Sequence, residues 1–173
     1  MKTRHAKVRN REETACETAQ PPRPPSHACG QYTITKPRGG TYALILRCST
    51  EESVQIGKLA RLQLRRGFYV YVGSAFGPGG VRARVAHHKR LSSRPHWHID
   101  FLRPHTQLED VWYSHESISR EHEWAQILGA LPGAFVPLAA FGSSDCKCRA
   151  HLFFFTARPS LRRFRQQVSR RMV

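Results

Sequence analysis

In two segments of the chain, successive side chains fall into two alternating sets, one for each face of an extended chain. Each alternation predicts a strand. In residues 41–47 the two faces carry Tyr42, Leu44 and Leu46 against Ala43 and Ile45. In residues 68–73 they carry Phe68, Val70 and Val72 against Tyr69, Tyr71 and Gly73. These are the clearest strands of the sequence, and each contains a tyrosine that points to a known side of it.

The remaining pattern predicts short strands and three helices, as in an α/β (α+β) domain. Short strands are expected near residues 54–56, 61–64, 98–102 and 111–114, and a strongly apolar one at 151–156. Helical spacing predicts helices at 81–91, 117–131 and 159–171. The core-facing residues are Val81, Val85 and Leu91 in the first helix, and Leu161, Phe164 and Val168 in the last. Residues 77–80, Gly-Pro-Gly-Gly, predict a turn, because they lack the ending of a phosphate-binding loop.

The first 38 residues differ in composition from the rest and are expected to form a disordered, basic, proline-containing tail. Ordered structure is expected from Gly39 onward, so that residues 39–173 form one domain ending in a basic helix. Such a tail adds non-specific affinity for phosphates, although a dispensable extension or a misassigned start is an equally good interpretation.

The expected domain is itself basic. The chain has 28 Lys and Arg against 12 Asp and Glu, and residues 39–173 hold 20 and 9 of them. A basic domain attracts a polyanion, most often nucleic acid, ahead of a membrane surface. No apolar run is long enough to cross a bilayer, and the N-terminus lacks an apolar signal core. With five cysteines, an odd number, these features favour a cytoplasmic protein with reduced thiols.

Five residues form a candidate site for phosphodiester chemistry. They are Tyr42 and Tyr71 on the strands, Arg84 and His88 four apart on the following helix, and Glu123 on a later helix. A carboxylate holds a divalent cation that polarises the phosphate, and an arginine neutralises the phosphoryl oxygens. A tyrosine or histidine positions or deprotonates the attacking water.

These residues stand in motifs that resemble those of the GIY-YIG nuclease superfamily. Gly40-Thr41-Tyr42 and Tyr71-Val72-Gly73-Ser74-Ala75 are similar to the two halves of its signature. Arg84-Val85-Ala86-His87-His88 resembles its Arg-apolar-x-x-His helix, and Glu121-His122-Glu123-Trp124-Ala125 its metal-binding helix. The small stand-alone Uri-type branch is most similar, with matching stretches at residues 56–59, 67–75, 96–100 and 142–148. The resemblance covers nearly all of residues 39–156.

The resemblance implies a small antiparallel sheet of three main strands flanked by helices. It also implies cleavage of DNA with one Mg²⁺ or Mn²⁺ and no small-molecule cofactor. In that scheme Tyr42 would position the nucleophilic water, with Tyr71 as its partner at the scissile phosphate. Arg84 would bind the phosphate, His88 would help proton transfer, and Glu123 would bind the metal. Gly40, Gly73 and Ser74 would support the motif, Gly73 by permitting close packing beside Tyr71.

The chain departs from the wider superfamily in two ways. Tyr42 and Tyr71 have 28 residues between them, which exceeds the usual hairpin but agrees with the Uri-type branch. Residues 39–173 contain no Asn, although the superfamily often has one near the end of the site. Ser144 or Asp145 is the substitute that we suggest.

Some positions keep a second interpretation. Glu121 is the alternative to Glu123, or else supports the helix or the site, and His87 would replace His88 if the helix register slipped. His96 and His98 alternate on an expected strand, so they would face one side and reach the DNA or serve the structure.

Cys146, Cys148 and His151 suggest zinc, but a four-ligand site would have to borrow another histidine. We therefore favour a structural role, or one at the edge of the site, without zinc for them. The sequence as a whole predicts a cytoplasmic, metal-dependent DNA endonuclease that does not associate with a membrane. The alternatives are a non-catalytic nucleic-acid-binding module of the same fold and a small zinc-binding accessory protein.

Overall fold

The computed structural model describes residues 34–171, and most of the expected tail, with Cys16 and Cys29, lies outside this range. The strands are β1 (Gly40–Cys48), β2 (Ser53–Ile56), β3 (Ala60–Gln63), β4 (Gly67–Ala75), β5 (Gln107–Ser114) and β6 (Leu152–Phe155). The helices are α1 (Gly80–Lys89), α2 (His98–Leu102), the 3₁₀ helix η1 (Arg103–His105), α3 (Glu121–Gly129) and α4 (Leu161–Arg171). This confirms the expected mixed α+β fold.

The main sheet is antiparallel and has the strand order β5-β1-β4-β6, with β2 and β3 forming a separate hairpin. Its fourth strand, β6, is the apolar segment expected as a strand at residues 151–156, and it pairs with β4. In the central pair, Tyr42 lies opposite Gly73 and Leu44 opposite Tyr71. Because directly opposed residues share a face of a sheet, the two tyrosines lie on the same face of adjacent strands.

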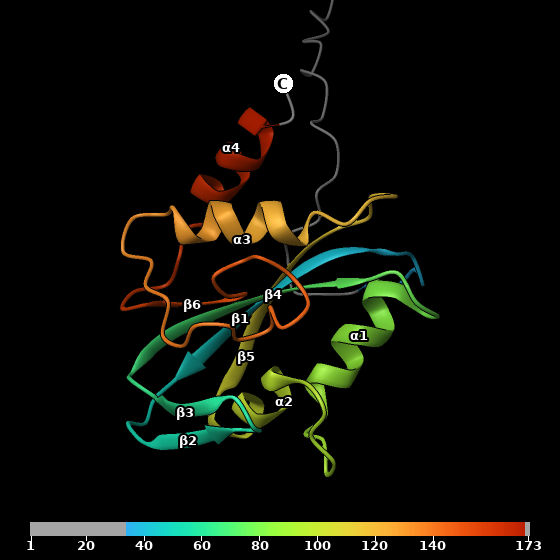
Figure 1. Ribbon diagram of the computed structural model, residues 1–173. Coiled ribbons are helices and arrows are strands. Elements are labelled where there is room, and N and C mark those ends of the chain that lie inside the picture. The colour runs from blue at the N-terminus through green and yellow to red at the C-terminus, as the bar shows by residue number, and fades with distance from the viewer. Residues whose placement is uncertain (1–33, 172–173) are drawn as a thin grey trace, which may run out of the picture.

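Both faces of this sheet are buried, which explains why its central strands are apolar on both sides. One face, with Tyr42, Tyr69 and Tyr71, packs against α1, α2 and the β2–β3 hairpin (Figure 1). The other face, with Ile45 and Val72, packs against α3 and α4 (Figure 1).

One strand prediction is wrong, and one predicted helix is shorter than expected. Residues 98–102 form helix α2 rather than a strand, because Asp100 Oδ2 accepts the backbone N–H groups of His96 and Trp97 and caps the turn. The helix expected at 117–131 begins only at Glu121, since the N–H of Arg120 is directed to the Thr41 hydroxyl.

The ends of the other elements also differ from expectation. Leu91 lies beyond the end of α1 and is exposed, whereas Val81 and Val85 are buried as predicted. The packed structure begins before residue 39: Ile34 contacts the core, and the Arg38 carbonyl accepts the N–H of Val81. Gly80 has a φ of 56°, and a Cβ there would lie 2.1 Å from that same carbonyl oxygen, so this turn requires glycine. Within residues 34–171, no helix is long and apolar enough to cross a membrane.

Candidate active site

Tyr42 lies directly over Gly73, and this contact determines where its hydroxyl points. A Cβ at residue 73 would lie 2.5 Å from the Tyr42 oxygen and 2.6 Å from the adjacent ring carbon. The glycine of the second motif therefore makes room for the tyrosine of the first, and not for Tyr71 as we expected. Tyr71 packs its ring edge-on against Phe141 and His88 on the same face.

His88 forms a hydrogen bond with Tyr42 across the gap between α1 and the sheet. The distance from its Nε2 to the tyrosine oxygen is 2.8 Å, and both side chains are 2% exposed. His87 is half-buried and its ring lies beside Asp100, whereas His88 is buried against Tyr42, as the expected helix register predicts. The other ring nitrogen of His88 has no hydrogen-bond partner in the described part of the chain and lies 3.9 Å from Asp100 Oδ1.

Tyr42, Tyr71 and His88 together form the tyrosine cluster, and burial controls the ionisation of all three side chains. It lowers the pKa of His88 to about 3, against the stabilising charge of Asp100. Burial, and then the charge of Glu121, raises the pKa of Tyr71, while Arg84 opposes the shift. The pKa of Tyr42 is raised mainly by its burial as well. At neutral pH the pair is therefore a neutral imidazole and a protonated phenol.

Arg84 stands one turn before His88 on α1 and lies against the ring of Trp97. Its guanidinium carbon is 4.2 Å from the ring centroid, which is a cation–π contact. An open hollow of about 260 Å³ lies beside them, lined by the glycine-rich turn, Arg84, His87 and Trp97. A cation and a half-exposed aromatic ring therefore face solvent together at the edge of the tyrosine cluster.

Helix α2 holds this edge in place through Asp100, which is 4% exposed. One carboxylate oxygen caps the helix, and the other lies 3.3 Å from His87 Nε2. Trp97 in turn packs edge-on against His87, with ring centroids 5.0 Å apart. Asp100 therefore positions both the indole under Arg84 and the imidazole beside it.

The carboxylate beside the tyrosine cluster is that of Glu121. Its oxygens lie 2.6 Å from the Ser74 hydroxyl and 2.9 Å from His151 Nδ1. Burial opposes its ionisation, but the contacts with His151 and Ser74 prevail and lower its pKa. Its negative charge reaches both Tyr42 and Tyr71 and raises the pKa of each.

Glu123 points to a different side of α3. Residues two apart on a helix are separated by about 200°, so Glu121 and Glu123 do not share a face. Glu123 Oε2 accepts a hydrogen bond of 2.8 Å from Arg120, which also pairs with Glu116. Of the two carboxylates in the motif, Glu121 contacts Ser74 and His151 and its charge raises the pKa of both tyrosines, whereas Glu123 pairs with Arg120.

The remaining predicted residues lie around this cluster in different ways. His98 starts α2, and its Nδ1 accepts the N–H of Gly142 at 3.0 Å, whereas His96 is exposed, so the two do not share a strand face. Ser144 and Asp145 are exposed on the loop before β6, and the charge of Asp145 is close enough to affect Tyr71. Gly40 lies in β1, where a Cβ would meet the Ser114 carbonyl.

A second group of polar side chains stands beside Glu121, on the α3 side of the sheet. His122, Cys146, Cys148 and His151 bring their ligand atoms within 4.8 Å of one another. His122 therefore supplies the additional histidine that the spacing of the cysteines left unassigned.

A family model matches residues 41–173, more than half of the chain. The chain belongs to this family, the domain of unknown function DUF123. Comparisons with curated proteins and with solved structures gave no match. The matched region contains Tyr42, Tyr71, Arg84, His88 and Glu121, whereas Gly40 lies just before it.

Three residues of this DUF123 site carry no role in the sequence-based prediction. Trp97 and Asp100 belong to a stretch that matches the Uri-type branch, yet their contacts with α1 depend on a helix that the pattern does not show. Gly142 is the third: a Cβ there would lie 2.9 Å from the Tyr71 ring, and its φ of 73° favours glycine. Gly142 begins the stretch 142–148 that matches the Uri-type branch, but that match does not indicate its packing against Tyr71.

The low pKa of His88 makes the DUF123 domain sensitive to acid. Folded His88 stays neutral to about pH 3, whereas its ordinary pKa is 6.5, so the unfolded chain binds the extra proton between these values. The free energy of unfolding therefore falls as the pH drops through this window, by a few kcal/mol at most. We expect the Tm difference between pH 7 and pH 4.5 to shrink in His88→Gln and to stay unchanged in His96→Gln. An equal drop in Tm between pH 7 and pH 4.5 in wild type and in His88→Gln would show that His88 is not the source of the acid sensitivity.

Proposed function

We propose that this DUF123 chain is a metal-dependent DNA endonuclease of the GIY-YIG type. The observation that carries the proposal is the buried Tyr42–His88 hydrogen bond, with Tyr71, Arg84 and Glu121 close enough to influence its charges. These side chains come from two strands and two helices that are far apart in sequence. A cytoplasmic location, expected from the cysteine content, belongs to the same proposal.

The hollow beside Arg84 supports a nucleotide as the ligand. A guanidinium pairs with phosphate oxygens in a fixed geometry, and an aromatic face such as Trp97 stacks on any base. The two groups are already in contact, 4.2 Å apart, beside a hollow of about 260 Å³. The formal charge of the whole chain, +16, adds long-range attraction for a phosphate backbone.

The residues present fit a single hard cation at Glu121. Its carboxylate has a lowered pKa and is therefore ionised at neutral pH. One carboxylate is a sufficient anchor for Mg²⁺ or Mn²⁺, which retain several water ligands in sites of this kind. Such a cation would supply charge neutralisation at the phosphate and acidify water. We therefore assign the metal-binding role to Glu121 in place of Glu123.

The other side chains have separate tasks in this proposal. Arg84 binds a phosphoryl oxygen and neutralises the charge that develops there. Tyr42 remains a phenol: it donates its hydrogen bond to Nε2 of neutral His88, which holds the phenol in place, and its oxygen accepts a hydrogen bond from the attacking water. Tyr71 directs a second hydroxyl to the same place. Because both phenols have raised pKa values, they act as hydrogen-bond donors and not as phenolates.

A pair of arginine variants on α1 tests the phosphate-binding role. Arg84→Ala is expected to lower the cleavage rate by about 10²–10³-fold, the usual effect of removing one charge-stabilising donor. Arg82→Ala is the matched control, since Arg82 is exposed on the same helix and bonds only the Thr35 carbonyl among its described contacts. The measurement is single-turnover cleavage of labelled DNA with saturating Mg²⁺ or Mn²⁺. Equal rates for the two variants would contradict the role of Arg84.

A further inference from the structure

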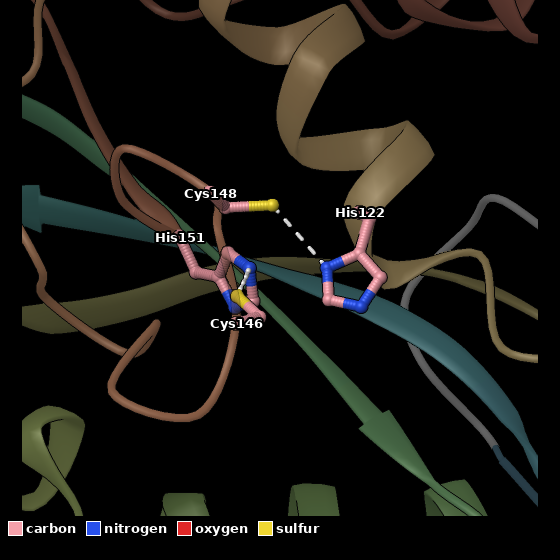
Figure 2. A group of neighbouring side chains, drawn as sticks. All are labelled: His122, Cys146, Cys148 and His151. Carbon is pink, nitrogen blue, oxygen red and sulfur yellow. Dashed lines mark hydrogen bonds between the residues drawn. The ribbon is translucent and has the colours of Figure 1, made fainter.

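Four side chains with metal-binding atoms converge where the loop before β6 meets the start of α3 (Figure 2). His122 Nδ1 lies 3.2 Å from Cys148 Sγ, and His151 Nε2 lies 3.5 Å from Cys146 Sγ. His122 comes from the first turn of α3, both cysteines from the loop, and His151 from the residue before β6. The cluster has no task in the cleavage reaction proposed above.

The distances fit a tetrahedral zinc ion. With bond lengths of about 2.3 Å to sulfur and about 2.0 Å to nitrogen, neighbouring sulfur and nitrogen ligands lie roughly 3.5 Å apart. Both measured sulfur–nitrogen distances are within about 0.4 Å of this value. Two thiolates and two imidazoles also complete the four-coordinate shell, as in structural zinc sites.

We propose that His122, Cys146, Cys148 and His151 bind one structural zinc ion. The site would use Nδ1 of His122 and Nε2 of His151, the atoms that already face the sulfurs. This proposal does not rest on the nuclease function, because none of the four zinc ligands has a role in the proposed cleavage reaction.

Glu121 strengthens the assignment from outside the ligand shell. Its Oε1 lies 2.9 Å from Nδ1 of His151, which leaves Nε2 of the same ring directed at Cys146. A carboxylate behind a metal-binding histidine fixes the ring's orientation and its tautomer. His151 is 2% exposed, so this orientation is held by packing as well.

The site also explains how a long irregular segment is held. Residues 130–151, between α3 and β6, contain no helix or strand, and segments of this length without secondary structure are uncommon in compact domains. A zinc ion would join the end of this segment to the first turn of α3. It would thereby hold Glu121, the neighbour of His122, beside Ser74 and the tyrosine cluster.

Metal analysis of the full chain tests the proposal. The protein is expressed with added zinc, purified under reducing conditions and analysed by plasma mass spectrometry, and Co²⁺ is then added to the metal-free protein. We expect about one zinc per chain and the visible absorption of tetrahedral, thiolate-bound Co²⁺. Reduced protein that holds no zinc and gives no such Co²⁺ spectrum would overturn the proposal, as would a stable Cys146–Cys148 disulfide in its place.

Variants locate the ion. Cys146→Ser/Cys148→Ser is expected to lose the zinc, whereas Cys48→Ala and Cys16→Ser/Cys29→Ser retain it. His122→Gln is a second test in case the double cysteine variant does not fold. In chelator competition it is expected to weaken zinc binding by more than about 100-fold, while its circular dichroism spectrum shows that the fold is unchanged. Glu121→Gln removes the charge behind His151 and no zinc ligand, and it is expected to weaken zinc binding by about 10–100-fold. Zinc retained in the 146/148 variant, or unchanged affinity in His122→Gln, would overturn the assignment.

Discussion

Glu121→Gln is expected to lower metal-dependent DNA cleavage by about 10³-fold, whereas Glu123→Gln stays within about threefold of wild type. Of the two glutamates, only Glu121 contacts Ser74 and has a charge that raises the pKa of both tyrosines, so we place the cation of the proposed reaction at its carboxylate. The loss corresponds to the several kcal/mol of charge stabilisation that a catalytic metal supplies. The measurement is the single-turnover rate as a function of Mg²⁺ concentration.

The two glutamates are a matched pair, since they occupy the same turn of α3 and receive the same substitution. Zinc content is measured in both variants, because Glu121 also contacts His151. If Glu121→Gln retains its zinc but loses cleavage, the defect lies in the binding of the catalytic cation. A loss of cleavage in Glu123→Gln alone would restore the original sequence-based assignment and reject ours.

Gly73→Ala is expected to destabilise the fold and to abolish most of the activity with one methyl group. The new Cβ would lie 2.5 Å from the Tyr42 oxygen, and Tyr42 is buried, so moving its ring disturbs the packing around it. Overpacking of this kind costs about 1–3 kcal/mol, or roughly 3–10 °C in Tm. Displacing the ring also breaks the Tyr42–His88 hydrogen bond, so we expect cleavage to fall by about 10²-fold even below the Tm.

Gly77→Ala is the control for stability, because a Cβ at residue 77 meets no atom within 4 Å. Its Tm should match that of wild type, since exposed substitutions usually change stability by less than about 0.5 kcal/mol. Thermal unfolding by circular dichroism gives both values. Equal melting and equal cleavage for Gly73→Ala and wild type would show that Tyr42 does not need its observed position.

Strand alternation was sufficient to predict one half of the site. A period of two assigns each residue of β1 and β4 to a face without knowledge of the partner strand, so Tyr42, Tyr71 and Gly73 were placed correctly. The spacing of Arg84 and His88 fixed their common face on α1 in the same way. Local periodicity therefore determines which side chains point together within an element.

The other half depends on contacts that periodicity does not contain. Helix α2 has only five residues, too few for helical spacing to differ from an alternating strand. The choice between Glu121 and Glu123 requires knowing which face of α3 meets the sheet. His122 approaches Cys148 across 26 residues of sequence, a contact that no local spacing indicates. These errors arise where a long loop or a short helix is positioned by its neighbours.

The measurement that tests the central claim most directly is cleavage of a panel of single-stranded, duplex and branched DNA by the purified chain. The protein is stripped of loosely bound metal and assayed with and without added Mg²⁺ or Mn²⁺. We predict that cleavage of at least one substrate requires the added cation and is lost in both Arg84→Ala and Glu121→Gln. Salt-sensitive DNA binding without cleavage of any substrate, or cleavage that both variants retain, would contradict the account and favour a binding module.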